Sequence, residues 1–278
     1  MKKSRINNVV VVSDLHCGCQ FGLCPPGPIG LEGGGSYRQS RPQAWVWKQW
    51  LKFWRDWVPQ ACHGEDYAIV INGDALDGVH HGSVSQITHN LSDQTRILKA
   101  SLQPILHPNQ KLFWISGTEA HVGPSGQDEE RAASLMGAIP DQFGNCARHE
   151  LWLNVGNGLC HFLHTISTTN SAAYESTAVM KELVDAYTES GRNRLRSPDV
   201  EVRSHRHRHL EVRVPTALGY GISFVTPGWQ LKTPFVYRTA GGRAASAQVG
   251  GSVIRQGDRD LYTRHWVRSA GRPKVVQI

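Results

Sequence analysis

The feature that most constrains the fold of this chain is a series of short apolar runs, each followed by acidic or histidine residues. The runs cover residues 8–13, 67–71, 111–116, 159–163 and 199–204. Runs of this length that are rich in β-branched residues predict buried strands. The polar residues that follow are Asp14 and His16, Asp74 and Asp77, Glu119 and His121, His164, and His205 and His207. Because the carboxyl ends of strands in open α/β sheets converge on one crevice, we expect these side chains to meet in space.

Helices and one long loop are expected between these strands. Residues 43–58 carry Trp, Leu and Val at three- and four-residue steps, which predicts an amphipathic helix that stops at Pro59. The tryptophan stripe fits packing on a sheet, and the alternative is a stacking platform for bases. Residues 17–42 are rich in Gly and Pro and predict an irregular loop insertion. Further helices are expected from an N-cap at Ser92 to about residue 106, over residues 128–137 and over residues 172–189.

The order of these elements predicts a layered α/β architecture. Gly156-Asn157-Gly158 lies between two apolar runs and signals a hairpin. From residue 210 onward, short apolar runs alternate with Gly and Pro turns, which predicts antiparallel strands. We find no internal repeat and no shift in composition, so we expect a single domain over residues 1–278, in which residues 210–278 complete the sheets.

Composition bears on partners and compartment. The formal net charge is +7. Such a charge indicates a polyanionic partner or, equally, a basic surface that only keeps the protein soluble. The arginines that favour the partner gather beside the last histidines and are Arg192, Arg194, Arg196, Arg203, Arg206, Arg208 and Arg213. No apolar run approaches the ~20 residues of a membrane span, so we expect a cytoplasmic protein. Its six cysteines are then reduced. Cys17, Cys19 and Cys24 lack the paired spacing of zinc sites and fit small loop residues, with a structural zinc as the alternative.

The mixture of carboxylates and imidazoles at the strand ends indicates a metal site. Such ligands suit Mn²⁺, Fe or Zn²⁺ better than Ca²⁺ or Mg²⁺, which favour all-oxygen shells. Two metal ions ~3.5–4 Å apart can share one carboxylate, hold a hydroxide between them and stabilise an in-line displacement at phosphorus. Asp74 is the natural bridge, because Gly73 allows a tight exit from the strand. We therefore expect two divalent metal ions, Mn²⁺ first, with Fe or Zn²⁺ as alternatives.

At these positions the chain resembles the calcineurin-like metallophosphoesterases. The family's pattern is D-x-H, G-D-x-x-D, G-N-H-[DE], a lone strand-end His and G-H-x-H. The corresponding residues are Asp14-Leu15-His16, Gly73-Asp74-Ala75-Leu76-Asp77, Gly117-Thr118-Glu119-Ala120-His121, His164 and Ser204-His205-Arg206-His207. The resemblance implies a four-layer αββα sandwich of two mixed β-sheets flanked by helices. The ligand sets that it implies are Asp14, His16 and His207 for one metal, His164 and His205 for the other, and Asp74 as the bridge. The long loop after the first motif is similar to that of phage or prophage members.

The third motif departs from the family's pattern. The family places an asparagine ligand directly after the glycine and a histidine next to it. Here Thr118, a poor metal ligand, follows Gly117. Our hypothesis is that Glu119 replaces the asparagine as a metal ligand and that His121 keeps the catalytic role of the family's histidine. We expect Asp77 to be the second catalytic residue.

Residues that border the motifs are candidates for substrate binding. Arg206, together with the cations of the site, would attract phosphate. His80 and His81 lie on a loop that should border the crevice, although exposed loop residues are the equal alternative. Ser204 stands where the family has glycine, which is a mild change. His209 follows the last motif and fits a surface or supporting residue.

These features together predict a metal-dependent phosphoric ester hydrolase. A phosphodiester in DNA, RNA or a nucleotide is the first expectation for its substrate, and a phosphomonoester is the alternative. A non-catalytic, metal-stabilised binding module is the alternative from another class, because a degraded motif can accompany loss of chemistry on the same fold.

Overall fold

The apolar run near the N-terminus forms β1 (Asn8–Val12), the strand around which the protein is built. All five of its residues are buried. Val9 and Val11 belong to the apolar cluster between two sheets, whereas Val10 and Val12 belong to the cluster under the helices. Because successive side chains of a strand point to opposite faces, a strand covered on both faces needs such a continuous apolar run. The computed structural model describes residues 6–80, 82–167, 172–217, 219–239, 246–271 and 275–277.

β1 lies inside a six-stranded mixed sheet with the order β13-β12-β1-β4-β5-β6. β1 pairs in parallel with β4 and antiparallel with β12. The other strands of this first sheet are β4 (Ala68–Asn72), β5 (Leu112–Ile115), β6 (Ala147–Arg148), β12 (Gln248–Gln256) and β13 (Leu261–Ser269). β4, β5 and β6 continue the parallel pairing, so the chain leaves β1, β4 and β5 at the same edge of the sheet.

A second, five-stranded mixed sheet packs face to face with the first. Its order is β10-β11-β9-β8-β7, with β9 parallel to both β8 and β11. The strands are β7 (Leu151–Val155), β8 (Gly158–Phe162), β9 (Val200–Arg203), β10 (Leu210–Thr216) and β11 (Gly219–Val225). The segment after residue 210 therefore contributes to both sheets. The expectation that its strands are all antiparallel is wrong for β11, which pairs in parallel with β9 because the edge strand β10 precedes it and the β10–β11 hairpin turns the chain back into the direction of β9.

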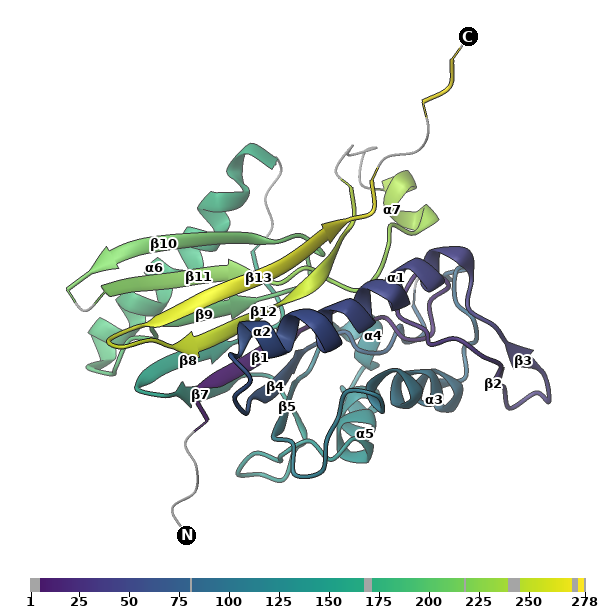
Figure 1. The fold of residues 1–278 in the computed structure, drawn as a ribbon, viewed down its shortest axis with the longest axis horizontal. Helices are drawn as coiled ribbons and strands as arrows, with labels where there is room; N and C mark the ends of the chain where they lie inside the picture. Colours follow the sequence, from purple (N-terminus) through teal and green to yellow (C-terminus); the bar gives the residue numbers. More distant parts are fainter. Residues whose placement is uncertain are drawn as a thin grey trace.

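Helices cover the outer faces of both sheets (Figure 1). Residues of α1 (Arg41–Lys52), α3 (Leu91–Leu102) and α5 (Gln127–Leu135) pack in the cluster on the outer face of the first sheet. α6 (Glu175–Asn193) lies against β10 and β11 of the second sheet. The predicted four-layer αββα sandwich of two mixed sheets is thus confirmed. The described part of the chain also contains three short helices, α2 (Val58–Ala61), α4 (Glu119–Val122) and α7 (Pro234–Thr239). A π-helical segment (Phe53–Trp57) and a 3-10 turn (Ala172–Tyr174) are the remaining helical segments of the described residues.

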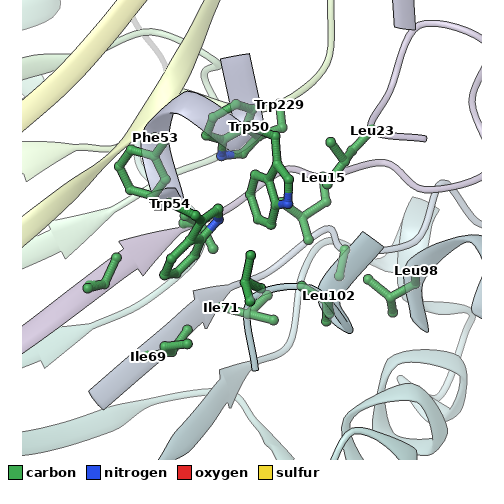
Figure 2. Close-up of a cluster of buried hydrophobic side chains, with 14 of the residues drawn as sticks. Leu15, Leu23, Trp50, Phe53, Trp54, Ile69, Ile71, Leu98, Leu102 and Trp229 are labelled. Carbon is green, nitrogen blue, oxygen red and sulfur yellow. The ribbon is translucent and has the colours of Figure 1, made fainter. Parts of the chain in front are cut away.

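The tryptophan stripe is a packing surface. Trp50 is fully buried, and its indole donates a hydrogen bond to the carbonyl of Ser101. Trp229 packs edge-on against Trp50 with ring centroids 4.7 Å apart, above the apolar residues of β4 (Figure 2). The helix does not stop at Pro59, because a π-helical segment (Phe53–Trp57) leads into α2 (Val58–Ala61) and places the proline in its first turn. A proline is tolerated there, since the first turn needs no donor from its nitrogen.

Two further expectations are corrected by local hydrogen bonds. α3 is capped by Asn90 and not by Ser92, because the Asn90 side chain accepts hydrogen bonds from the N–H groups of Ser92 and Asp93. The loop of residues 17–42 contains a short hairpin of β2 (Ile29–Gly30) and β3 (Ser36–Tyr37). Its first part is buried and includes Cys17, Cys19 and Cys24. None of the helices in the described ranges is long and apolar enough to cross a membrane.

Candidate metal centre

The predicted ligands at the ends of β1, β4, β8 and β9 converge at one edge of the two sheets. Their side chains form two groups in which the nitrogen and oxygen atoms lie within 4.8 Å of one another. The first group is Asp14, Asp74, His164 and His205, and the second is Asp14, His16 and His207. Asp14 belongs to both groups, and Asp74 also lies in a group with His16 and His121. Both carboxylates therefore stand between two sets of imidazoles, whereas the sequence pointed to Asp74 alone as the bridge.

The distances within the centre are those of side chains that face one another. His164 Nε2 lies 2.9 Å from Asp74 Oδ2, and His207 Nε2 lies 3.2 Å from Asp14 Oδ1. His205 is more exposed, with Nδ1 at 3.9 Å from Asp74 Oδ2. Neither carboxylate forms an ion pair with a lysine or arginine of the described residues, so histidines supply their only ion-pair partners there.

This arrangement fits a divalent cation. Asp14 Oδ1 is buried and accepts no hydrogen bond of good geometry within the part of the chain that the structure describes. Buried polar atoms are nearly always satisfied, and the groups that face this oxygen are the imidazoles of His207 and His164, which are themselves potential metal ligands. Convergent carboxylate and imidazole atoms suit Mn²⁺, Fe or Zn²⁺.

Backbone conformation brings the ligands inward. Eight non-glycine residues of the described chain have positive φ, and the five at the centre are Asp14, His16, Asp74, His205 and His207. Non-glycine residues rarely adopt this left-handed conformation, and such strain concentrates at functional sites. The last motif is not extended: the chain turns at His205 and again at His207, with φ of 71° and 50°.

Neighbouring groups fix the orientation of three imidazoles. His164 Nδ1 lies 2.6 Å from the carbonyl of Asn72, so it carries the proton and turns Nε2 to the centre. His16 Nδ1 faces the carboxylate of Asp77 at 3.2 Å, and His121 Nδ1 faces the carbonyl of Asp77 at 2.7 Å. Partners of this kind set the tautomer and the basicity of metal-ligating histidines. Asp77, predicted to be catalytic, thus contacts His16 and His121 and serves to orient them.

The carboxylates and the imidazoles of the centre change one another's pKa values. Burial raises the pKa of Asp74, but the opposite charge of His164 outweighs it and holds this pKa well below its usual range. Burial lowers the pKa of His164, but Asp74 outweighs that effect and raises it to about 10. The same opposition lowers the pKa of Asp14 and raises that of His207. Without a cation Asp74 therefore keeps a proton on His164, and Asp14 favours a proton on His207. For His121, burial and the neighbouring His16 lower the pKa to about 4, so its imidazole is neutral at pH 7.

The hypothesis that Glu119 is a metal ligand does not agree with this geometry. Glu119 is exposed on α4 and belongs to none of the ligand groups of the described residues. Thr118 contacts the centre instead: its N–H donates to Asp74 Oδ1 at 2.7 Å, and its hydroxyl lies 3.2 and 3.3 Å from the two carboxylate oxygens. The chain begins α4 directly after Thr118, and this turn carries the Glu119 side chain away from the centre.

A buried network supports the strand ends beneath the ligands. Ser204 Oγ accepts a hydrogen bond from the Asn72 amide at 2.6 Å and lies 2.6 Å from Thr226 Oγ1. Thr226 Oγ1 also lies 2.6 Å from Ser13 Oγ. These four residues join the ends of β1, β4, β9 and β11, and all are buried. The change from the family's glycine to Ser204 was expected to be mild. The Ser204 hydroxyl is, however, one of the groups that form this hydrogen-bond network.

Glu129 is a further residue that sequence reasoning missed. It is fully buried in α5, and its carboxylate accepts hydrogen bonds from the N–H groups of Ala75 and Gly117. Burial and the nearby charge of Asp74 raise its pKa to about 7. Only the run of three acids at positions 128–130 could have drawn attention to it, and such a run is ordinary in the first turn of a helix.

Two of the three candidate substrate-binding residues, His80 and Arg206, lie among the described residues. The His80 ring packs edge-on against His121 with centroids 4.5 Å apart, and Nε2 lies 3.6 Å from Asp77. His81 lies outside the described residues. Arg206 donates a hydrogen bond to the carbonyl of Ser167. His209 takes no part in the ligand groups; it faces the carbonyl of Val225 and packs on His265.

Most arginines of the arginine-rich stretch are in ion pairs with acidic residues. The pairs are Arg192–Glu189, Arg196–Asp199, Arg203–Glu182, Arg203–Glu201, Arg208–Glu175 and Arg213–Glu211.

Fold and site together define an α/β sandwich protein with a carboxylate–histidine centre at the edge of its two sheets. No protein-family model and no curated protein matches the chain. Among solved structures it is similar to Vps29 of Entamoeba histolytica in complex with zinc, with a TM-score of 0.42 and 9% identity over 95% of this chain and 94% of that one. It is also similar to a conserved uncharacterized protein of Streptococcus pneumoniae described as a predicted phosphoesterase, with a TM-score of 0.34 and 9% identity over 94% and 98% of the two chains.

A third similar structure is the sulfate thiohydrolase SoxB of Thermus thermophilus, with a TM-score of 0.39 and 12% identity. This chain is covered over 97% of its length but matches only 57% of SoxB. None of the three is described as a phage protein. At scores and identities this low, the similarities do not bear on what this chain does.

Proposed function

We propose that this protein is a dinuclear-metal phosphoesterase of the calcineurin-like kind. The observation that carries the proposal is the convergence of two buried carboxylates and four imidazoles on one point, with one carboxylate oxygen left without a hydrogen bond in the described chain. His16 and His207 would hold one cation and His164 and His205 the other, with Asp14 and Asp74 between them. When bound, two divalent cations would activate water and stabilise charge at phosphorus.

The residues around the cations have distinct tasks. His121 donates from Nδ1 to the carbonyl of Asp77, so its neutral ring keeps a lone pair on Nε2. That atom can accept a hydrogen bond from water at the phosphate, but it cannot donate one to a phosphate oxygen. Asp77 keeps His16 in the tautomer that turns Nε2 to the centre.

We propose a phosphodiester of a nucleic acid or nucleotide as the substrate. Support comes from the net charge of +7 and from the half-buried His80 at the rim, beside His121. The ion-paired arginines weaken the case for a long polyanion and favour a short one, because few of them are left to track a backbone.

The test is hydrolysis of bis-p-nitrophenyl phosphate and p-nitrophenyl phosphate with added Mn²⁺. We expect turnover of both, with the diester preferred. Asp74→Asn should lower the rate at least about 100-fold, because it removes a charged ligand. Asp56→Asn, an exposed change on the π-helical segment, should leave the rate unaltered. Turnover of neither ester by protein that binds Mn²⁺ would favour the binding module, and a preference for the monoester would refute the diesterase assignment.

A further inference from the structure

Glu129 connects the two loops that carry the centre of the proposed metal site. Its Oε1 accepts a hydrogen bond from the Ala75 N–H at 2.7 Å, and its Oε2 accepts one from the Gly117 N–H at 2.6 Å. Ala75 directly follows Asp74, and Gly117 directly precedes Thr118. One side chain of α5 therefore joins the loop after β4 to the loop after β5.

The position of these loops determines where the Asp74 carboxylate lies. The backbone at Gly117 passes so close that an added Cβ would stand 2.0 Å from Asp74 Oδ1. The next residue, Thr118, donates its N–H to the same oxygen at 2.7 Å. A shift of the Gly117 loop of only a few tenths of an ångström would change both contacts, and with them the oxygen that faces His164.

The pair of hydrogen bonds that Glu129 accepts requires a carboxylate. Both partners of Glu129 are N–H donors, so each of its oxygens must act as an acceptor. A glutamine of the same shape would set an NH₂ group against one of the two N–H groups. The carboxylate is fully buried, and no lysine, arginine or histidine of the described chain lies within ion-pair distance of it. Because both hydrogen bonds of this buried side chain go to the two loops that hold Asp74, its loss would act first on these loops.

We propose that Glu129 is a positioning residue that holds the Asp74 carboxylate in place for metal binding. It touches no ligand atom and acts through the backbone of Ala75 and Gly117. The inference rests on the proposed function, because it assumes that Asp74 binds a cation.

The same helix offers a matched control. The two oxygens of Glu130 accept hydrogen bonds from the N–H groups of Cys146 and Ala147 at 2.9 and 2.6 Å. The hydrogen bonds are of the same kind as those of Glu129, although Glu130 is only half-buried, and the partners lie on and beside β6, which carries no ligand. Glu129→Gln therefore disrupts a pair of backbone hydrogen bonds at the centre, and Glu130→Gln disrupts a pair of the same kind away from it.

The experiment measures Mn²⁺ binding by titration calorimetry and unfolding by circular dichroism for the full chain and both variants. Glu129→Gln should raise the Kd for Mn²⁺ roughly 10- to 100-fold, the usual effect of losing an outer support of a metal ligand. Glu130→Gln should lower the Tm without changing the Kd. An unchanged Kd in Glu129→Gln, or an equal rise in Glu130→Gln, would overturn the inference.

Failure of this inference and failure of the proposed function give different results. Unchanged Mn²⁺ binding by Glu129→Gln refutes the inference alone. If the unaltered protein binds no divalent metal, the proposed function fails and the role of Glu129 fails with it. If Glu129→Gln does not fold, Glu129→Asp replaces it, because aspartate keeps two acceptors on a side chain one methylene shorter. Weaker Mn²⁺ binding is then expected, and binding as tight as in the unaltered protein would refute the positioning role.

Discussion

His16 and His207 lie 191 positions apart in the chain, yet their Nε2 atoms face each other at 3.1 Å. His16 Nδ1 faces the Asp77 carboxylate and carries a proton, so His16 Nε2 presents its lone pair. In the absence of a cation, a proton on His207 Nε2 faces both His16 Nε2 at 3.1 Å and Asp14 Oδ1 at 3.2 Å, and Asp14 raises the pKa of His207. A bound cation needs both lone pairs, so it must displace this proton.

Metal binding should therefore release protons and strengthen with pH. Asp74 raises the pKa of His164 to about 10, so this ring is protonated at neutral pH, and Asp14 raises the pKa of His207. Because a ligating imidazole must be neutral, affinity for Mn²⁺ should rise between about pH 6 and pH 8 and keep rising towards the pKa of His164. Calorimetry in buffers of different ionisation enthalpy measures the protons released. An affinity that does not change with pH would contradict the protonated state described above.

Gly117→Ala should damage the centre. The new Cβ would lie 2.0 Å from Asp74 Oδ1 and 2.4 Å from its backbone nitrogen. Overpacking of this kind costs about 1–3 kcal/mol and would displace the carboxylate. We expect a lower Tm and weaker Mn²⁺ binding. Gly35→Ala is the control, because its Cβ would meet no atom within 4 Å; a loss as large in Gly35→Ala would show that the effect is not specific.

Substitution of Thr118 should lower kcat/KM, whereas substitution of Glu119 should not. Thr118→Val keeps the shape and the N–H contact but removes the hydroxyl 3.2 Å from Asp74 Oδ1. The loss of a hydrogen bond to a charged group, about 1.5–3 kcal/mol in full, sets the upper limit for the fall in kcat/KM. Glu119→Gln, at an exposed position, should leave Mn²⁺ content and turnover unchanged. Metal analysis of both purified variants tests this, and loss of metal in Glu119→Gln would restore Glu119 as a ligand.

Ser204→Gly should destabilise the protein although it restores the residue typical of the family. The change removes the Oγ that accepts the Asn72 amide hydrogen and contacts Thr226. A buried donor left without this acceptor costs about 1–3 kcal/mol. Urea denaturation should show that loss in the free energy of unfolding. Ser204→Ala, which adds no backbone freedom, should show most of it, and a Ser204→Ala variant as stable as the unaltered protein would refute the supporting role.

Much of the fold could be predicted because the decisive signals are local. The run of residues 8–13 identifies a strand by its length and β-branched content, and its lack of alternation already indicates a sheet covered on both faces. The acids and histidines follow such runs directly, so their meeting at one sheet edge could be expected from strand direction alone. Burial of the tryptophan stripe likewise follows from its helical spacing, as Trp50 shows.

Only the tertiary structure decided the contacts between distant segments. Spacing could not distinguish Thr118 from Glu119 at the third motif, because the turn into α4 determines which of them faces Asp74. Glu129 lies 54 positions from Ala75, and no local pattern marks it. The ion pairs of the arginines also depend in part on long-range packing, as for Arg203, which pairs with Glu182 of α6. Local sequence thus determined which residue types stand at the strand ends, whereas long-range packing determined which atoms face the centre, because that depends on backbone turns and partners far away in the chain.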